Sequence, residues 1–133
     1  MAWRVLVVDD EARYGELLRR VLDRDGFEVT VTDKSDAAMQ VLLSGRVDLL
    51  ITDLHMPGLT GLDLTELAAS LPRAPRMLLI TAQKSMLEGA YRRLRNVQCL
   101  LKPFSLEDFR AKVSLLTDQW LKDSEGAPLP LPS

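Results

Sequence analysis

Five polar residues of this chain have the types and positions needed to handle a phosphoryl group. Asp9 and Asp10 end the first apolar run, Asp53 ends a later one, and Thr81 and Lys102 follow two more. Unpaired carboxylates in one place repel each other, so at least one pKa should rise. Mg²⁺ removes that repulsion because it prefers oxygen ligands. A lysine suits a phosphate, and a hydroxyl can donate to it. Together the five residues predict a site for Mg²⁺ and a phosphoryl group.

The elements that must position these residues alternate along the chain. Short apolar runs typical of buried strands separate longer segments with helical spacing. The strands are expected at Trp3–Val8, Glu28–Thr32, Val47–Thr52, Arg76–Thr81 and Gln98–Leu101. Near-continuous apolar strands joined by helices are typical of a parallel sheet covered on both faces. We therefore predict an α/β, flavodoxin-like (βα)5 fold, doubly wound around a five-stranded sheet of order 2-1-3-4-5.

This order brings the polar residues together. Ligands of open α/β sheets bind beyond the carboxyl ends of the strands. Strands one and three are neighbours, about 4.8 Å apart, so their three acids should converge. Taken alone, Asp10 is better explained as a helix cap, because a single aspartate after a strand usually plays that part. Convergence of several strand ends favours the metal site.

The helical segments carry their own signals. The first should carry Leu17, Leu18, Val21 and Leu22 on one face and stop at Gly26. The second spans about 35–44, ending at Gly45, and the fourth about 84–94. The third and fifth open with capping-box patterns, Thr60 with Asp63 and Ser105 with Asp108. The third should then bury Leu64, Leu67 and Leu71. The apolar stripe of the fifth is expected to contain Leu106, Phe109, Val113, Leu116 and Trp120.

Composition restricts the classes of protein. The chain has 133 residues, 47% of them hydrophobic, and a formal net charge of −2. One domain over residues 1–121 is expected, with a proline-rich tail or linker remnant over 122–133. The single cysteine excludes an internal disulfide, and no signal peptide or membrane-spanning run is visible, so we expect a cytoplasmic protein that binds no membrane. Without a basic arm or helix-turn-helix, direct nucleic-acid binding is not expected.

Four stretches resemble the response-regulator receiver domain of two-component signalling, of the chemotaxis-regulator-like kind. They are "VLVVDDE", "DLLITDLHMPGLTGLDL", "LLITA" and "LKPF". The resemblance implies that a histidine kinase or phosphotransfer protein phosphorylates Asp53. It implies Mg²⁺ ligands in Asp9, Asp10, Asp53 and the backbone carbonyl of His55. Lys102 would contact the phosphoryl oxygens.

The resemblance also implies a switch rather than a turnover enzyme, with self-catalysed phosphorylation and dephosphorylation only. Thr81 would be the switch hydroxyl, beside the backbone N–H of Ala82, and the side chains of His55 and Gln83 lie where they can modulate hydrolysis. The bond before Pro103 would be cis. Output would pass through the face of the fourth helix, fifth strand and fifth helix, to an output protein, a missing output domain of the same chain or a second copy on phosphorylation.

Two positions depart from the family pattern. Cys99 stands where an aromatic switch residue is expected, and Tyr91 is a speculative substitute. A basic stretch with Arg92, Arg93 and Arg95 precedes the fifth strand; it is either a solvated helix face or a docking surface for an acidic partner.

Two further functions stay open. The alternative reading is a phosphorylation-independent interaction scaffold with a receiver fold, supported by Cys99. A phosphatase with an aspartyl nucleophile is a third hypothesis, although no segment of the chain is long enough for the cap domain common in such enzymes.

Overall fold

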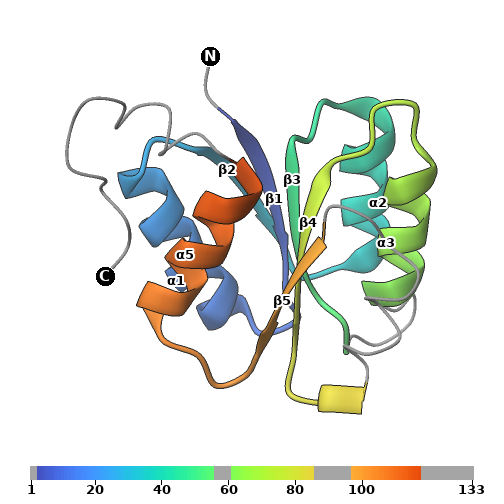
Figure 1. The fold of residues 1–133 in the computed structure, drawn as a ribbon. Coiled ribbons are helices and arrows are strands. Elements are labelled where there is room, and N and C mark those ends of the chain that lie inside the picture. Colours follow the sequence, from blue (N-terminus) through green and yellow to red (C-terminus); the bar gives the residue numbers. More distant parts are fainter. Residues whose placement is uncertain (1–2, 56–60, 86–96, 118–133) are drawn as a thin grey trace.

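The predicted sheet is present in the structure. A computed structural model describes residues 3–55, 61–85 and 97–117. The strands are β1 (Arg4–Val8), β2 (Glu28–Thr32), β3 (Leu49–Asp53), β4 (Arg76–Thr81) and β5 (Val97–Leu101). They form one parallel sheet in the order β2-β1-β3-β4-β5 (Figure 1). The predicted fold class and strand order are therefore confirmed.

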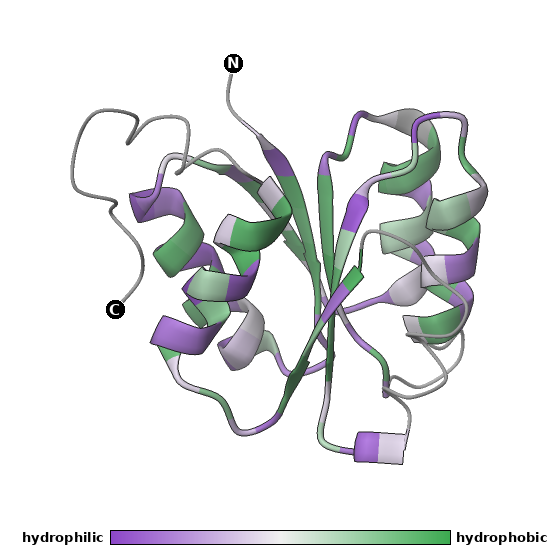
Figure 2. Cartoon of the chain, in the orientation of Figure 1, coloured by the Kyte–Doolittle hydropathy of each residue, from purple (hydrophilic) through white to green (hydrophobic). Residues whose placement is uncertain are grey.

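Helices cover both faces of this sheet. The helices α1 (Ala12–Arg24) and α5 (Leu106–Thr117) lie on one face, and α2 (Ser35–Ser44) and α3 (Gly61–Ser70) lie on the other (Figure 1). Because β1, β3 and β4 are buried on both faces, their sequences are apolar almost throughout (Figure 2). None of the helices that the structure describes is long and apolar enough to cross a membrane.

Two apolar cores result, one on each face. Leu18, Leu22, Phe109 and Val113 are buried in the α1–α5 core. Leu42, Leu64, Ala68 and Cys99 are buried in the α2–α3 core. The two cores pack against the sheet from both sides, and because the strands are parallel their carboxyl ends lie along one edge.

The predicted apolar faces are only partly buried. Of the leucines expected to be buried by the third helix, Leu64 is fully buried, whereas Leu67 and Leu71 are half-buried. Leu17 is 43% exposed, because α1 buries Gly15, Leu18 and Leu22 and leaves Leu17 at the border of that face. Leu106 is 41% exposed, because it lies in the first turn of α5, ahead of the stripe that begins at Phe109. The capping prediction for α5 is confirmed in part, since Ser105 Oγ accepts the N–H of Asp108 at 3.0 Å.

Most other expected boundaries agree with the structure. The bounds predicted for β2, β4 and α2 match, whereas β3 begins two residues later than predicted, at Leu49. The remaining expectations lie outside the described residues. They are the Thr60 cap, Trp120, the tail and most of the helix over 84–94, including Tyr91, Arg92, Arg93 and Arg95.

Candidate functional site

Three carboxylates meet at the carboxyl ends of β1 and β3. Asp9 and Asp10 follow β1, and Asp53 is the last residue of β3. One oxygen from each carboxylate lies within 4.8 Å of the others. Asp9 and Asp53 are only 2% and 6% exposed, whereas Asp10 is exposed. The structure therefore brings together the acids that the strand order predicted, with two of them almost without solvent.

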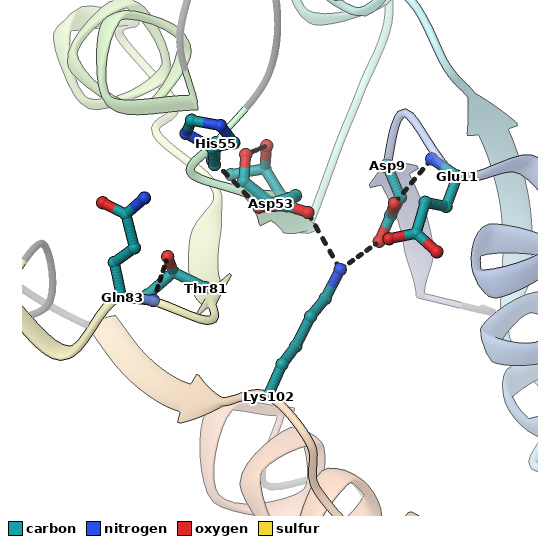
Figure 3. A network of polar contacts seen from close by, with 8 residues as sticks. Asp9, Glu11, Asp53, His55, Thr81, Gln83 and Lys102 are labelled. Carbon is teal, nitrogen blue, oxygen red and sulfur yellow. Dashed lines mark hydrogen bonds and ion pairs between the residues drawn. The ribbon is translucent and has the colours of Figure 1, made fainter.

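Lys102 enters the same site from the end of β5. Its ammonium lies 2.9 Å from Oδ2 of Asp53 and 3.4 Å from Oδ2 of Asp9 (Figure 3). The site holds three carboxylates and this one ammonium, so it keeps a negative charge. Burial opposes the charge on Lys102, but its hydrogen bond to Asp53 and the charges of both acids outweigh burial and raise the Lys102 pKa.

The pKa of the Asp9 carboxyl is raised above its ordinary value. Burial raises the pKa of the Asp9 carboxyl, although the N–H of Glu11 and the ammonium of Lys102 act against it. The charge of Asp53 raises it further. One carboxyl pKa therefore rises, as predicted, but its main cause is burial, and the repulsion between acids that was expected to raise it is a smaller contribution.

Three strand ends share one local geometry. Oδ1 of Asp9 accepts the N–H of Glu11 at 2.9 Å, and Oδ1 of Asp53 accepts the N–H of His55 at 2.9 Å. Thr81 Oγ1 accepts the N–H of Gln83 at 3.0 Å (Figure 3). These two-residue turns are typical of Asp and Thr at the start of loops. In both aspartates they occupy Oδ1 and leave Oδ2 to face Lys102.

Asp10 is not a helix cap, which corrects the interpretation that its position alone favoured. The N-cap residue of α1 is Glu11, and its side chain makes no capping hydrogen bond. The carboxylate of Asp10 faces the other two acids instead. It is the exposed member of the cluster, through which a hydrated ion could approach.

Asp10 and Asp53 line a small pocket of about 170 Å³. Glu11, His55, Ala82, Gln83 and Lys102 form the rest of its wall. The donors fit Mg²⁺, since they are carboxylate oxygens on a negatively charged patch and one side stays open to water. The volume suits a phosphoryl group rather than a large substrate.

Other predicted residues have clear positions. His55 is exposed beside Asp53, and the Lys102–Pro103 bond is cis, as the resemblance implied. Thr81 is fully buried, and Cys99 is 6% exposed in the α2–α3 core. Cys99 thus packs as a small apolar residue.

Sequence reasoning missed Glu11 and Tyr14. Glu11 lines the pocket, and the ring of Tyr14 lies 4.5 Å from the ammonium of Lys102. Helical spacing was the available signal for Tyr14, which lies one turn after Asp10 at the start of α1.

Comparison with known proteins identifies the class that this fold and site define. Residues 5–114 match the model of the response regulator receiver domain family. The chain belongs to that family, and the resemblance seen in the sequence is confirmed.

Individual relatives and solved structures support the same family assignment. The response regulator MprA of Mycobacterium ulcerans is 34% identical over 96% of this chain and 56% of its own length. The uncharacterized transcriptional regulatory protein YrkP of Bacillus subtilis is 35% identical over 85% of this chain and 48% of its own length. The response regulator TrrA of Thermotoga maritima, solved with Mg²⁺ and BeF, matches with a TM-score of 0.77 and 29% identity, over 86% of this chain and 98% of that one. The chain thus spans about half the length of the curated relatives.

Proposed function

We propose that this receiver domain is a switch in which a histidine kinase or phosphotransfer protein phosphorylates Asp53 in a Mg²⁺-dependent reaction. One observation carries the proposal. Asp9, Asp10 and Asp53 converge within 4.8 Å, and Lys102 lies 2.9 Å from Asp53. Such a cluster is poorly suited to a purely structural role. Burial raises the pKa of Asp9, so keeping this carboxyl charged lowers the stability of the fold.

The acceptor carboxylate is already oriented. Asp53 is held by the N–H of His55 through Oδ1 and by Lys102 through Oδ2. In the proposed reaction a carboxylate oxygen of Asp53 attacks phosphorus. The bond from phosphorus to the donor atom breaks, and that atom leaves with the electron pair. Lys102 stays beside the transferred oxygens and balances their charge.

The metal would be held by Asp9, Asp10, Asp53 and the backbone carbonyl of His55. When bound, Mg²⁺ supplies positive charge that stabilises the phosphoryl oxygens. The TrrA structure was determined with Mg²⁺ and BeF, which supports this assignment by similarity.

The product would be an aspartyl phosphate, and water attacking its phosphorus would restore Asp53. The domain would therefore phosphorylate and reset itself without turning over a separate substrate. The side chains of His55 and Gln83, both exposed, would influence that water.

Phosphorylation would first change the hydrogen bonding of Thr81. A phosphoryl group adds roughly −1.5 to −2 charge and new acceptor oxygens. The Thr81 hydroxyl and the N–H of Ala82 are the donors proposed to turn toward it. The change would pass to the face of β5, α5 and the segment 84–94, which would bind an output protein, a missing output domain or a second copy.

We further propose how the chain is organised and where it acts. Residues 1–121 would form the receiver, and 122–133 would be a proline-rich tail or a linker remnant. The cytoplasm, where a histidine kinase can reach the domain, is its proposed location. DNA or membrane contact is not assigned to this segment.

An intact-mass measurement tests the proposal. With Mg²⁺ and acetyl phosphate, the wild-type protein should gain one phosphoryl group, whereas Asp53→Asn should gain none. Omitting Mg²⁺ should suppress the gain. If Asp53→Asn gains the same mass as wild type, Asp53 is not the acceptor. If neither protein is modified and BeF does not bind, a phosphorylation-independent scaffold becomes the better explanation; release of phosphate from added esters would instead indicate a phosphatase.

A further inference from the structure

The ammonium of Lys102 is bounded on a third side, by an aromatic ring. Lys102 Nζ lies 4.5 Å from the ring centroid of Tyr14, within the roughly 6 Å over which a cation and a ring face attract. Tyr14 belongs to the first turn of α1 and is half-buried. The two carboxylates and the ring thus enclose the ammonium together.

This third contact matters because lysine is flexible. Its four-carbon stem gives the ammonium many positions from which it can reach a carboxylate. The distance to Asp9, 3.4 Å, is longer than the 2.9 Å to Asp53, so the carboxylates alone hold the ammonium unevenly. The Tyr14 ring closes off positions on the α1 side.

The ring is itself held from the core. Phe104 meets it edge-on at 5.6 Å with an interplanar angle of 76°. Phe104 in turn stacks on Phe109 at 6.0 Å, and Phe109 is fully buried in the α1–α5 core. The aromatic chain therefore ties the position of Tyr14 to the packing of α5.

The next residue fixes the helix that carries the ring. A Cβ at Gly15 would lie 2.9 Å from Cγ1 of Val31, so α1 lies close against β2 at this point. Burial also raises the pKa of the Tyr14 phenol, so the ring stays neutral at physiological pH.

We propose that Tyr14 is a positioning residue for phosphorylation: its ring face, supported by Phe104 and Phe109, holds the Lys102 ammonium beside Asp53. The inference rests on the proposed function, since the ammonium held in this way is the one that would meet the incoming phosphoryl group. Tyr14 itself does not touch that group.

The rate of phosphorylation by acetyl phosphate tests the role of the ring. Tyr14→Leu should react about fivefold more slowly than wild type, the loss expected for a partly buried cation–π contact. Tyr14→Phe keeps the ring face and should retain most of the rate. Leu17→Ala, an exposed position three residues further along α1, should react at the wild-type rate.

A spectroscopic measurement separates positioning from general support of the fold. Protons next to the Lys102 ammonium should show an upfield ring-current shift in the NMR spectrum, identified by its loss in Lys102→Arg. The shift should persist in Tyr14→Phe and disappear in Tyr14→Leu. If Tyr14→Leu does not fold, Tyr14→Met takes its place in both measurements.

The outcomes distinguish this inference from the proposed function. If wild type accepts phosphate and Tyr14→Leu reacts equally fast, the inference is wrong and the proposed function stands. A Tyr14→Phe rate as low as that of Tyr14→Leu also overturns it, because the ring face would not be what matters. If wild type accepts no phosphate, the proposed function fails and the inference fails with it.

Discussion

Replacing Gly61 with alanine should lower the free energy of unfolding by about 3 kcal/mol, the upper part of the range for overpacked sites. A Cβ at Gly61 would overlap the carbonyl oxygen of Asp53 and would lie 2.6 Å from Cα of Leu54. These are backbone atoms, which cannot rotate away as a flexible side chain could. The strand end that carries Asp53 must therefore shift, and phosphorylation should slow as well. Denaturant unfolding and the rate with acetyl phosphate measure the two effects.

Gly26→Ala is the matched control for that prediction. Gly26 has a φ of +91°, yet no atom lies within 4 Å of a Cβ built there. Alanine should be strained by its backbone conformation alone, which destabilises by roughly 1–2 kcal/mol. Its phosphorylation rate should stay at the wild-type value while the protein is folded. Wild-type stability in Gly61→Ala would show that the contact between α3 and Asp53 is not as close as described.

Asp9→Asn should stabilise the protein without Mg²⁺ and destabilise it, relative to wild type, with Mg²⁺. Because the folded-state pKa of Asp9 is raised above the ordinary 3.8, the charged carboxylate penalises folding. The penalty is absent well below pH 3.8, grows as the pH rises from 3.8 toward the folded-state pKa, and is fully present above that pKa. Asparagine removes it, and its side-chain oxygen can still accept the N–H of Glu11.

Magnesium should reverse the order of stability of the wild-type protein and Asp9→Asn. Wild type should gain about 2.7 kcal/mol when Mg²⁺ is present at 100 times its dissociation constant. The variant should bind Mg²⁺ at least about tenfold more weakly, because even outer partners of metal ligands have effects of that size. Thermal unfolding of both proteins at neutral pH, with and without Mg²⁺, measures the crossover.

Asp10→Asn provides the comparison for Asp9→Asn. Asp10 is exposed, so its loss should weaken Mg²⁺ binding while leaving stability without the ion nearly unchanged. If Asp9→Asn lowers stability in the absence of Mg²⁺, the charge of Asp9 stabilises the fold and the direction of its pKa shift is wrong.

The sequence was sufficient to predict the sheet and the meeting of the acids. Apolar runs mark buried parallel strands, and the topology places the ends of β1 and β3 side by side, so the convergence of Asp9, Asp10 and Asp53 needed no knowledge of side-chain packing. The prediction of Mg²⁺ then followed from the repulsion of clustered carboxylates and from the preference of this ion for oxygen ligands. Lys102 was placed correctly because β5 ends at the same edge.

The features that the sequence could not predict depend on how each helix is rotated about its axis and how closely it approaches the sheet. Leu17 and Leu106 fit an apolar periodicity, but the axial rotation of α1 and the start of α5 leave both exposed. The contact of Tyr14 with Lys102 depends on the same rotation. The contact of Gly61 with Asp53 depends on how closely the start of α3 approaches the end of β3. The contact of Tyr14 has no sequence motif of its own; Gly61 lies in the quoted stretch "DLLITDLHMPGLTGLDL", but that stretch does not indicate how close the approach is.

Chemical mapping of the phosphorylated residue tests the assignment of Asp53 most directly. Hydroxylamine attacks the acyl carbon of an aspartyl phosphate, releasing phosphate and leaving a hydroxamate on the aspartate. After phosphorylation with acetyl phosphate and Mg²⁺, we expect hydroxylamine to remove the added mass and peptide mapping to find the hydroxamate at Asp53 alone. A phosphoryl group that resists hydroxylamine, or a hydroxamate at Asp9 or Asp10, would contradict the assignment.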